Sequence, residues 1–162
     1  MSKEKIEKTN AMRQLDRGKI PYKVQEYVYD EKDLSGERLS ELNHLPEERV
    51  YKTIVLKGNK TGYLVVDIPS LAEIDLKKVA RISGNKSVEL VNVADLEHLT
   101  GYVRGGCSPV GMKKEFPKFI DEGVLQYQEI YISAGKRGLQ LLLDPKDLIR
   151  FEKITVGDLI QK

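Results

Sequence analysis

The residues best suited to chemistry lie in one glycine-rich stretch, GYVRGGCSPVGMKK, at 101–114. Four of its residues are glycine, and it also holds the single cysteine, Cys107, and the hydroxyl of Ser108. Glycine allows positive φ and a close approach to the backbone, at an entropic cost on folding. Backbone amides beside Arg104 and the two lysines at its end can bind an anion or a polarised carbonyl group. We therefore expect this loop to hold the reacting part of a ligand.

Two known catalytic loops do not fit the segment GCSPVG at 106–111. A phosphate-binding P-loop would continue with Lys and then Ser or Thr, where this chain has Met112 and Lys113. Pro109 also removes an amide donor that would hold phosphate. A nucleophile elbow, G-x-S-x-G, would need glycine in place of Val110. We reject both interpretations.

Thiol and imidazole chemistry receive little support. Cys107 has no histidine near it in the sequence to generate a thiolate, so we interpret it as a packing residue. The two histidines, His44 and His98, are far apart and have no neighbours at ligand spacing. This argues against a zinc site and against a histidine-based triad. We expect no metal and no cofactor.

A second glycine loop and one lysine complete the candidates. The loop SAGKRG at 133–138 combines a hydroxyl, two glycines and two cations, and is either a solvated hairpin turn or a second anion-binding loop. Lys52 lies in the otherwise apolar stretch VYKTIVL, where strand alternation places it on one face with Val50 and Ile54. Its ammonium group is therefore either at a sheet edge in water or in a pocket.

Short helices and strands alternate irregularly around these segments, and several strands are neighbours in sequence. This pattern predicts one α+β domain over 1–162, with a curved mixed or antiparallel sheet, or a partly closed barrel, and short helices packed on it. Hydrophobic periodicity and turn residues predict helices at 3–18, 35–43, 73–84, 92–101 and 116–127, and strands at 22–30, 50–57, 62–69, 88–91, 129–135 and 139–145, followed by helical turns to the end.

Composition narrows the class of protein. The chain has 162 residues, with 27 Lys and Arg against 25 Asp and Glu, a net charge of +2 that is too small to hold nucleic acid tightly by itself. No apolar run is long enough to span a membrane, and the N-terminus lacks the apolar core of a secretory signal. One cysteine cannot form an internal disulfide. We expect a cytoplasmic protein without membrane partners.

Three motifs occur in order along the chain: VYKT at 50–53, GYVRGGCSPVGMKK at 101–114 and ISAGKRGL at 132–139, with DLKKVA at 75–80 between the first two. Together they resemble the YbaK/ProX-type aminoacyl-tRNA editing family, in particular its YbaK/EbsC branch. The resemblance implies a mixed α+β fold, a pocket for the 3′ end of a mischarged tRNA, and deacylation of Cys-tRNA(Pro). It also implies prolyl-tRNA synthetase as a partner in a ternary complex.

The resemblance assigns roles to single positions. Lys52 matches the essential lysine of the family, Thr53 follows it as in the family pattern, and Tyr27 matches an aromatic residue that lines the pocket. Gln140 stands where some deacylases of this branch have an aspartate, which puts the rate and the preferred amino acid in question. The GGxSPxG motif is matched by Gly105, Gly106, Ser108, Pro109 and Gly111, and the SxGxRG motif by Ser133, Gly135, Arg137 and Gly138.

The reaction we expect is hydrolysis of an aminoacyl ester with help from the substrate. The cysteine thiolate attacks its own ester carbonyl, because a well-oriented intramolecular group reaches an effective molarity of about 10⁵ M or more. Lys52 would stabilise the developing charge and anchor the terminal phosphate and ribose. Backbone amides around Gly105–Ser108 would form an oxyanion hole, and Ser108 or Ser133 would hydrogen-bond the substrate. Two alternatives remain open. One is an editing enzyme for Ala- or Ser-charged tRNA, and the other is a non-catalytic module that binds an aminoacyl or nucleotide ligand.

Overall fold

The computed structural model describes residues 7–44 and 46–162. The part of the predicted first helix before residue 7, including Ile6, lies outside the described residues. The elements, in chain order, are α1 (Asn10–Arg17), β1 (Lys23–Glu26), α2 (Gly36–Asn43), η1 (Glu47–Arg49), β2 (Tyr51–Gly58), β3 (Gly62–Pro69), α3 (Leu76–Ser83), β4 (Val88–Leu90), α4 (Val93–Thr100), β5 (Lys118–Asp121), η2 (Glu122–Gln126), β6 (Ile130–Lys136), β7 (Leu139–Leu143), α5 (Pro145–Glu152) and β8 (Thr155–Gly157).

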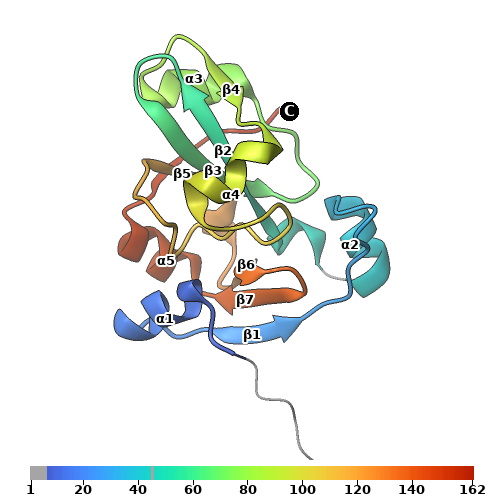
Figure 1. The fold of residues 1–162 in the computed structure, drawn as a ribbon. Coiled ribbons are helices and arrows are strands. Elements are labelled where there is room, and N and C mark those ends of the chain that lie inside the picture. Colours follow the sequence, from blue (N-terminus) through green and yellow to red (C-terminus); the bar gives the residue numbers. More distant parts are fainter. Residues whose placement is uncertain (1–6, 45) are drawn as a thin grey trace, which may run out of the picture.

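The strands form two sheets, and the α+β class with mixed pairing is confirmed (Figure 1). The larger sheet has the order β4-β2-β3-β5-β8, antiparallel from β4 to β3 and parallel from β3 to β8. The smaller sheet, β1-β7-β6, is antiparallel. A single parallel bridge between Val50 and Tyr131 joins the two sheets where β2 begins. Neither sheet closes on itself among the described residues.

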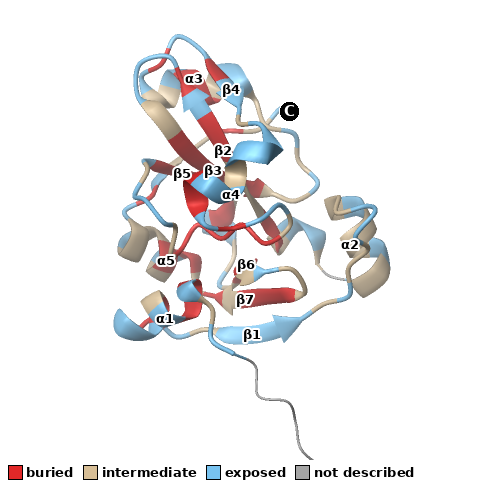
Figure 2. Cartoon of the chain, viewed as in Figure 1, coloured by how far each residue is buried: buried red, intermediate tan, exposed pale blue. Residues whose placement is uncertain are grey.

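Three hydrophobic clusters hold these layers together. The largest packs α1 and α5 against the inner face of β6 and β7, around side chains such as Leu15 and Leu148. The second packs α3 against the larger sheet. The third is small, with Val55, Val65, Tyr102 and Cys107 under the glycine-rich loop. Figure 2 shows the buried segments running along the central strands, while β1 is exposed along its length.

Local sequence explains where the α-helices begin. Each begins after a polar residue whose side chain accepts a hydrogen bond from a backbone amide of the first turn. Gly84 and Gly101 end α3 and α4 in the left-handed conformation, as the glycine positions predict. The α-helices have eight residues each, and no helix among the described residues is long and apolar enough to cross a membrane. The capping residues are Thr9, Ser35, Asp75, Asn92 and Asp144.

Two predictions near the C-terminus are wrong. The predicted helix at 116–127 is strand β5 followed by the 3-10 helix η2. All four residues of β5 are buried, because this parallel strand lies between β3 and β8, and such a strand lacks the alternation that would identify it. The helical turns expected up to the end stop with α5, and β8 follows as an edge strand. The other predicted elements are confirmed, with α1, α3 and β1 shorter than predicted, and the 3-10 helix η1 was not predicted.

Candidate active site

A cavity of about 630 Å³ lies where the first half of β2 meets the glycine-rich loop and the smaller sheet. Six of the predicted site residues line it, namely Tyr27, Lys52, Thr53, Gly105, Ser133 and Gln140. The other seven, Gly106, Ser108, Pro109, Gly111, Gly135, Arg137 and Gly138, do not. The start of α2, the segment 70–73 and the exposed side chains of Leu90 and Val93 complete the wall. The structure thus brings six of the predicted residues to the cavity wall, while the other seven are not part of that wall.

The cavity lies at a free edge of β2. Strand β4 pairs with β2 only at Leu56–Gly58, so residues 51–54 pair with β3 alone among the described strands. The Val55 carbonyl accepts a hydrogen bond from Val91 on the side away from β3. Because antiparallel residues alternate in the direction of their backbone groups, the backbone groups of Thr53 also point to this free edge. This edge explains how Lys52 and Thr53, from opposite faces of the strand, both reach the cavity.

Lys52 lines the cavity at the free edge of β2, so the two positions that the sequence left open, a sheet edge and a pocket, coincide here. Its side chain is partly buried, and the loss of water lowers the pKa of its ammonium group. Glu73 and Glu37 line the same cavity, and their negative charges act in the opposite direction and raise this pKa. The cavity wall therefore carries the partly desolvated cation Lys52 and the two carboxylates that act on its pKa, together with Arg104.

Thr53 is hydrogen-bonded to an acid that the sequence analysis did not single out. Its hydroxyl donates to Oδ1 of Asp67 over 2.5 Å, and the two residues are direct partners in the β2–β3 register. Asp67 has no exposed surface, and burial raises the pKa of its carboxyl to about 7. An aspartate in the otherwise apolar strand GYLVVDIP was the only signal in the sequence.

The two glycine loops touch each other. Arg137 Nε donates a hydrogen bond to the Arg104 carbonyl oxygen over 2.7 Å. A Cβ on Gly106 would lie 3.1 Å from the backbone nitrogen of Arg137, and one on Gly105 would lie 3.3 Å from its Nε. A side chain on Gly106 would therefore crowd the backbone of the neighbouring loop, while Gly105 also lines the cavity.

Tyr102 packs closely against two further glycines, Gly111 and Gly135, a role that was not predicted from the sequence. Its hydroxyl donates to the Val110 carbonyl over 2.6 Å, and the side chain is buried. A Cβ on Gly111 would lie 2.8 Å from the Tyr102 hydroxyl, and a Cβ on Gly135 would lie 2.7 Å from the ring. Both glycines also have positive φ. Tyr102 thus fills the space between the two loops behind the cavity.

The centre of the glycine-rich loop turns inward. Ser108 is fully buried, and its hydroxyl accepts a hydrogen bond from the Val110 amide over 3.2 Å. The Gly106 amide donates to the Val103 carbonyl over 2.9 Å, so it is already engaged. Cys107 lines the cavity but is 7% exposed, and burial raises the pKa of its thiol to about 12. This supports the interpretation of Cys107 as a packing residue.

Tyr27 bridges both loops from the N-terminal side. Its amide donates to the Gly138 carbonyl over 2.9 Å, and its hydroxyl donates to the Gly105 carbonyl over 3.2 Å. Burial raises the pKa of this hydroxyl, which stays protonated. Opposite Tyr27, the Ser133 hydroxyl accepts from the Gly135 amide, and the buried Gln140 has no hydrogen-bond partner for Oε1 among the described residues.

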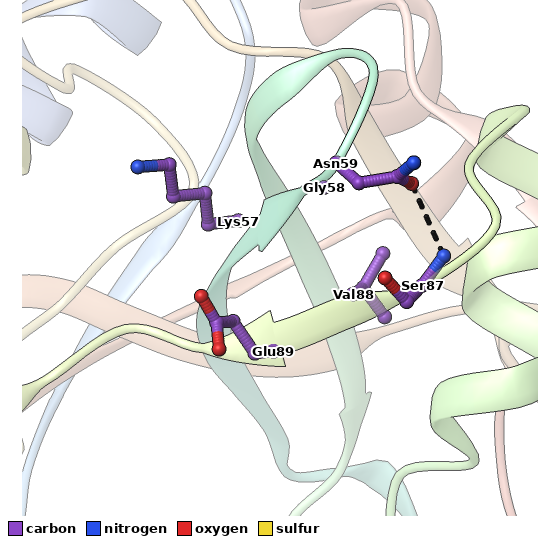
Figure 3. Close-up of a pocket in the computed structure, with 6 residues that line it drawn as sticks. All are labelled: Lys57, Gly58, Asn59, Ser87, Val88 and Glu89. Atoms are coloured by element: carbon purple, nitrogen blue, oxygen red, sulfur yellow. Dashed lines mark hydrogen bonds between the residues drawn. The ribbon is translucent and has the colours of Figure 1, made fainter.

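A second, shallower hollow of about 310 Å³ lies at the far end of the β2–β3 hairpin (Figure 3). Two hydrogen bonds join Asn59 and Ser87 there: the Ser87 amide donates to the Asn59 side chain over 3.1 Å, and the Asn59 amide donates to the Ser87 carbonyl over 3.1 Å. Lys57 stacks on the Tyr63 ring, with Nζ 5.6 Å from the ring centroid. None of the predicted site residues lies there, and no group of three or more His, Cys, Asp or Glu that could hold a metal ion occurs within the described residues.

Comparisons with known proteins identify the family of this chain. Residues 32–151 match the model of the aminoacyl-tRNA editing domain. The chain is 49% identical over 164 residues to an Enterococcus faecalis protein named "Putative Cys-tRNA(Pro)/Cys-tRNA(Cys) deacylase EbsC", which covers 98% of this chain and 100% of that protein. A proline–tRNA ligase of Thermosipho africanus is 22% identical over 70% of this chain and 20% of the ligase. The fold matches the crystal structure of a "putative trans-editing enzyme for prolyl tRNA synthetase" with a TM-score of 0.79 and 23% identity, over 94% of this chain and 96% of that one. The chain belongs to the aminoacyl-tRNA editing domain family.

Proposed function

We propose that this protein is a trans-editing deacylase that releases the amino acid from mischarged tRNA, with Cys-tRNA(Pro) as its preferred substrate. The observation that carries the proposal is the position of Lys52 and Thr53 side by side on the wall of the cavity. The cavity volume of about 630 Å³ is within the range of small-molecule sites, which suits the aminoacyl end of a tRNA. Family membership and the 49% identity to the Enterococcus faecalis protein support the substrate class.

The chemistry needs little from the protein beyond placement and charge. The substrate thiolate attacks the ester carbonyl, a C–S bond forms, the C–O bond to the terminal ribose breaks, and the thiol proton passes to the departing ribose oxygen. Water then opens the cyclic thioester and releases cysteine. A free thiol is only a few per cent ionised near neutral pH, so the positive charge of Lys52 accelerates the first step by stabilising the thiolate and the oxyanion.

The oxyanion hole that we propose uses two of the amides in the expected range Gly105–Ser108 and leaves out that of Gly106. The Gly106 amide is engaged with Val103. The amides of Gly105 and Cys107 have no hydrogen-bond partner among the described residues, and both residues line the cavity. We assign the oxyanion to these two donors. Ser108 and Gly111 hold the loop in shape, Ser133 faces the substrate, and Gln140 contacts the amino acid.

We extend the proposal to the partner and the location. The chain matches one fifth of a proline–tRNA ligase. The net charge of this chain is only +2, which offers few contacts to tRNA phosphates. A prolyl-tRNA synthetase that delivers the tRNA would compensate for this weak grip, so we propose a ternary complex in the cytoplasm. We further propose that residues 1–162 act as one editing domain.

The test compares esters. Labelled Cys-tRNA(Pro), Ala-tRNA(Pro) and Ser-tRNA are incubated with substoichiometric protein, and release of the amino acid is followed. We expect many turnovers on the cysteine ester and at least about tenfold slower release from the serine ester, because a hydroxyl is a far weaker internal nucleophile than a thiol. Equal rates on cysteine and serine would contradict thiol assistance. Protection of all three esters would support the binding-module alternative.

A further inference from the structure

A buried acid stands behind one wall of the cavity. Thr53 is partly buried and lines the cavity, while Asp67 on the neighbouring strand β3 has no exposed surface. The Thr53 hydroxyl donates to Asp67 Oδ1 over 2.5 Å. Asp67 Oδ2 is also buried and has no hydrogen-bond partner among the described residues. Thr53 therefore connects an incompletely paired carboxyl group to the ligand space.

The surroundings of Asp67 bring opposing charges close to it. Lys118 on β5 and Glu152 on α5 form an ion pair of 3.1 Å, with side chains 7% and 16% exposed. Lys118 lowers the pKa of the Asp67 carboxyl and Glu152 raises it, but burial has the largest effect. Tyr51 on β2 and Cys107 in the glycine-rich loop also lie close enough for the Asp67 charge to raise their pKa values. Because Lys118 is already paired with Glu152, it does not fully neutralise Asp67.

The state of this acid decides what the Thr53 hydroxyl offers to a ligand. A threonine hydroxyl has one proton to donate and lone pairs to accept with. When Asp67 is ionised, the proton of Thr53 is directed to Asp67 and the lone pairs are left for the cavity. When Asp67 is protonated, it can donate to Thr53, whose own proton is then free to point into the cavity. Asp67, which does not line the cavity, thus determines whether the Thr53 hydroxyl acts as a hydrogen-bond donor or acceptor toward a ligand in the cavity.

We propose that Asp67 is a positioning residue that holds the Thr53 hydroxyl as an acceptor for the α-ammonium group of the aminoacyl ester. This inference rests on the proposed function. The ammonium group is the strongest hydrogen-bond donor of such a ligand, and hydrogen bonds to charged groups are among the strong ones. Glu37 and Glu73 on the same wall supply negative charge, which offsets the positive charges of Lys52 and Arg104 that also line the cavity.

The first test is a double-mutant cycle on Cys-tRNA(Pro) with Thr53→Val, Asp67→Leu and the double variant. Each single change should lower kcat/KM by at least about tenfold, because a hydrogen bond to a charged group is lost. The double variant should be no slower than Thr53→Val, since Asp67 acts through Thr53. Asp67→Asn keeps an acceptor for Thr53 and should restore most of the activity. Losses that multiply in the double variant would overturn the proposal.

Asp121→Leu is the matched control for Asp67→Leu. Asp121 is also a buried strand aspartate, 3% exposed, but its oxygens accept hydrogen bonds from the Leu159 and Gly123 amides. This variant should keep the wild-type kcat/KM while losing stability. A loss of activity as large as that of Asp67→Leu would show that any buried aspartate has this effect, and would contradict a specific role.

The second test does not depend on turnover. The pKa of Asp67 is measured by carboxyl carbon NMR in the wild type and in Thr53→Val, with and without an adenosine that carries cysteine on its 3′ position through an amide. The pKa should rise in Thr53→Val, and the probe should lower it in the wild type alone. No response to the probe in an active wild type would overturn this inference and leave the proposed function standing. If the probe shifts the pKa of Asp67 as expected but the protein cleaves no ester, the proposed function is overturned and this inference on ligand binding stands.

Discussion

Arg137 Nε donates a hydrogen bond to the Arg104 carbonyl oxygen over 2.7 Å, and this contact locks the two glycine loops together at the rim of the cavity. Strand β5 and η2 separate the two loops in the sequence, yet the two loops contribute different residues to one site. The first loop brings Gly105 and Cys107 to the cavity wall, and the second brings Ser133 there and packs its backbone against Gly106. The site is therefore a property of the pair of loops.

Gly111→Ala should destabilise the fold by about 1–3 kcal/mol more than Gly62→Ala does. Both glycines have a φ of 76°, so the backbone strain is matched. A Cβ on Gly111 would lie 2.8 Å from the Tyr102 hydroxyl and 3.0 Å from backbone atoms of Asn10 and Ala11, whereas a Cβ on Gly62 would meet nothing within 4 Å. Urea denaturation of both variants measures the difference. Equal losses of unfolding free energy in the two variants would show that Tyr102 and α1 move aside without destabilising the fold, and would contradict the prediction.

Cys107→Ala should keep kcat/KM on Cys-tRNA(Pro) within about threefold of the wild type, because the reacting thiol belongs to the substrate. Burial raises the pKa of the Cys107 thiol to about 12, so alkylation by iodoacetamide near neutral pH should be slow in the folded protein and fast after unfolding. Deacylation rates and mass spectrometry of the alkylated protein check both statements. If Cys107→Ala is inactive and Cys107 of the folded wild type is alkylated rapidly, the attacking thiol belongs to the protein and the prediction is contradicted.

Asp67 should make the fold less stable as the pH rises from about 4 to about 7. Its folded pKa of about 7 lies above the ordinary value of 3.8, so in this range the folded state holds a proton that the unfolded state has released. Each pH unit then lowers the free energy of unfolding by up to about 1.4 kcal/mol relative to Asp67→Asn, which has no such titration. Urea denaturation of both proteins across this pH range measures it. A constant difference would contradict the raised pKa.

Much of the fold could be predicted from local sequence. The GNKT turn between two β-branched runs predicts the β2–β3 hairpin, and polar residues such as Asn92 predict where helices begin. Strand β5 could not be predicted in this way, because it is a buried parallel strand whose partners, β3 and β8, are distant in sequence. The short edge strand β8 depends on β5 and was missed with it.

The site could be predicted in part. The residue types around Lys52 and the two glycine loops indicated an anion-friendly pocket, and six of the predicted residues line the cavity. The role of Tyr102 depends on its packing against Gly135, which is distant in the sequence. Asp67 faces Thr53 across the β2–β3 hairpin, which the sequence predicts, but the full burial of Asp67 depends on the elements packed around the hairpin.

The most direct test of the central claim compares Lys52→Ala with Lys57→Ala in single-turnover deacylation of Cys-tRNA(Pro). Both lysines lie on β2, but Lys52 lines the cavity and Lys57 is exposed near the hairpin end. We expect Lys52→Ala to lose at least about 100-fold in rate, as for removal of one stabilising group at a developing oxyanion, with an unchanged circular dichroism spectrum. Lys57→Ala should react like the wild type. Equal rates for Lys52→Ala and the wild type would contradict the account.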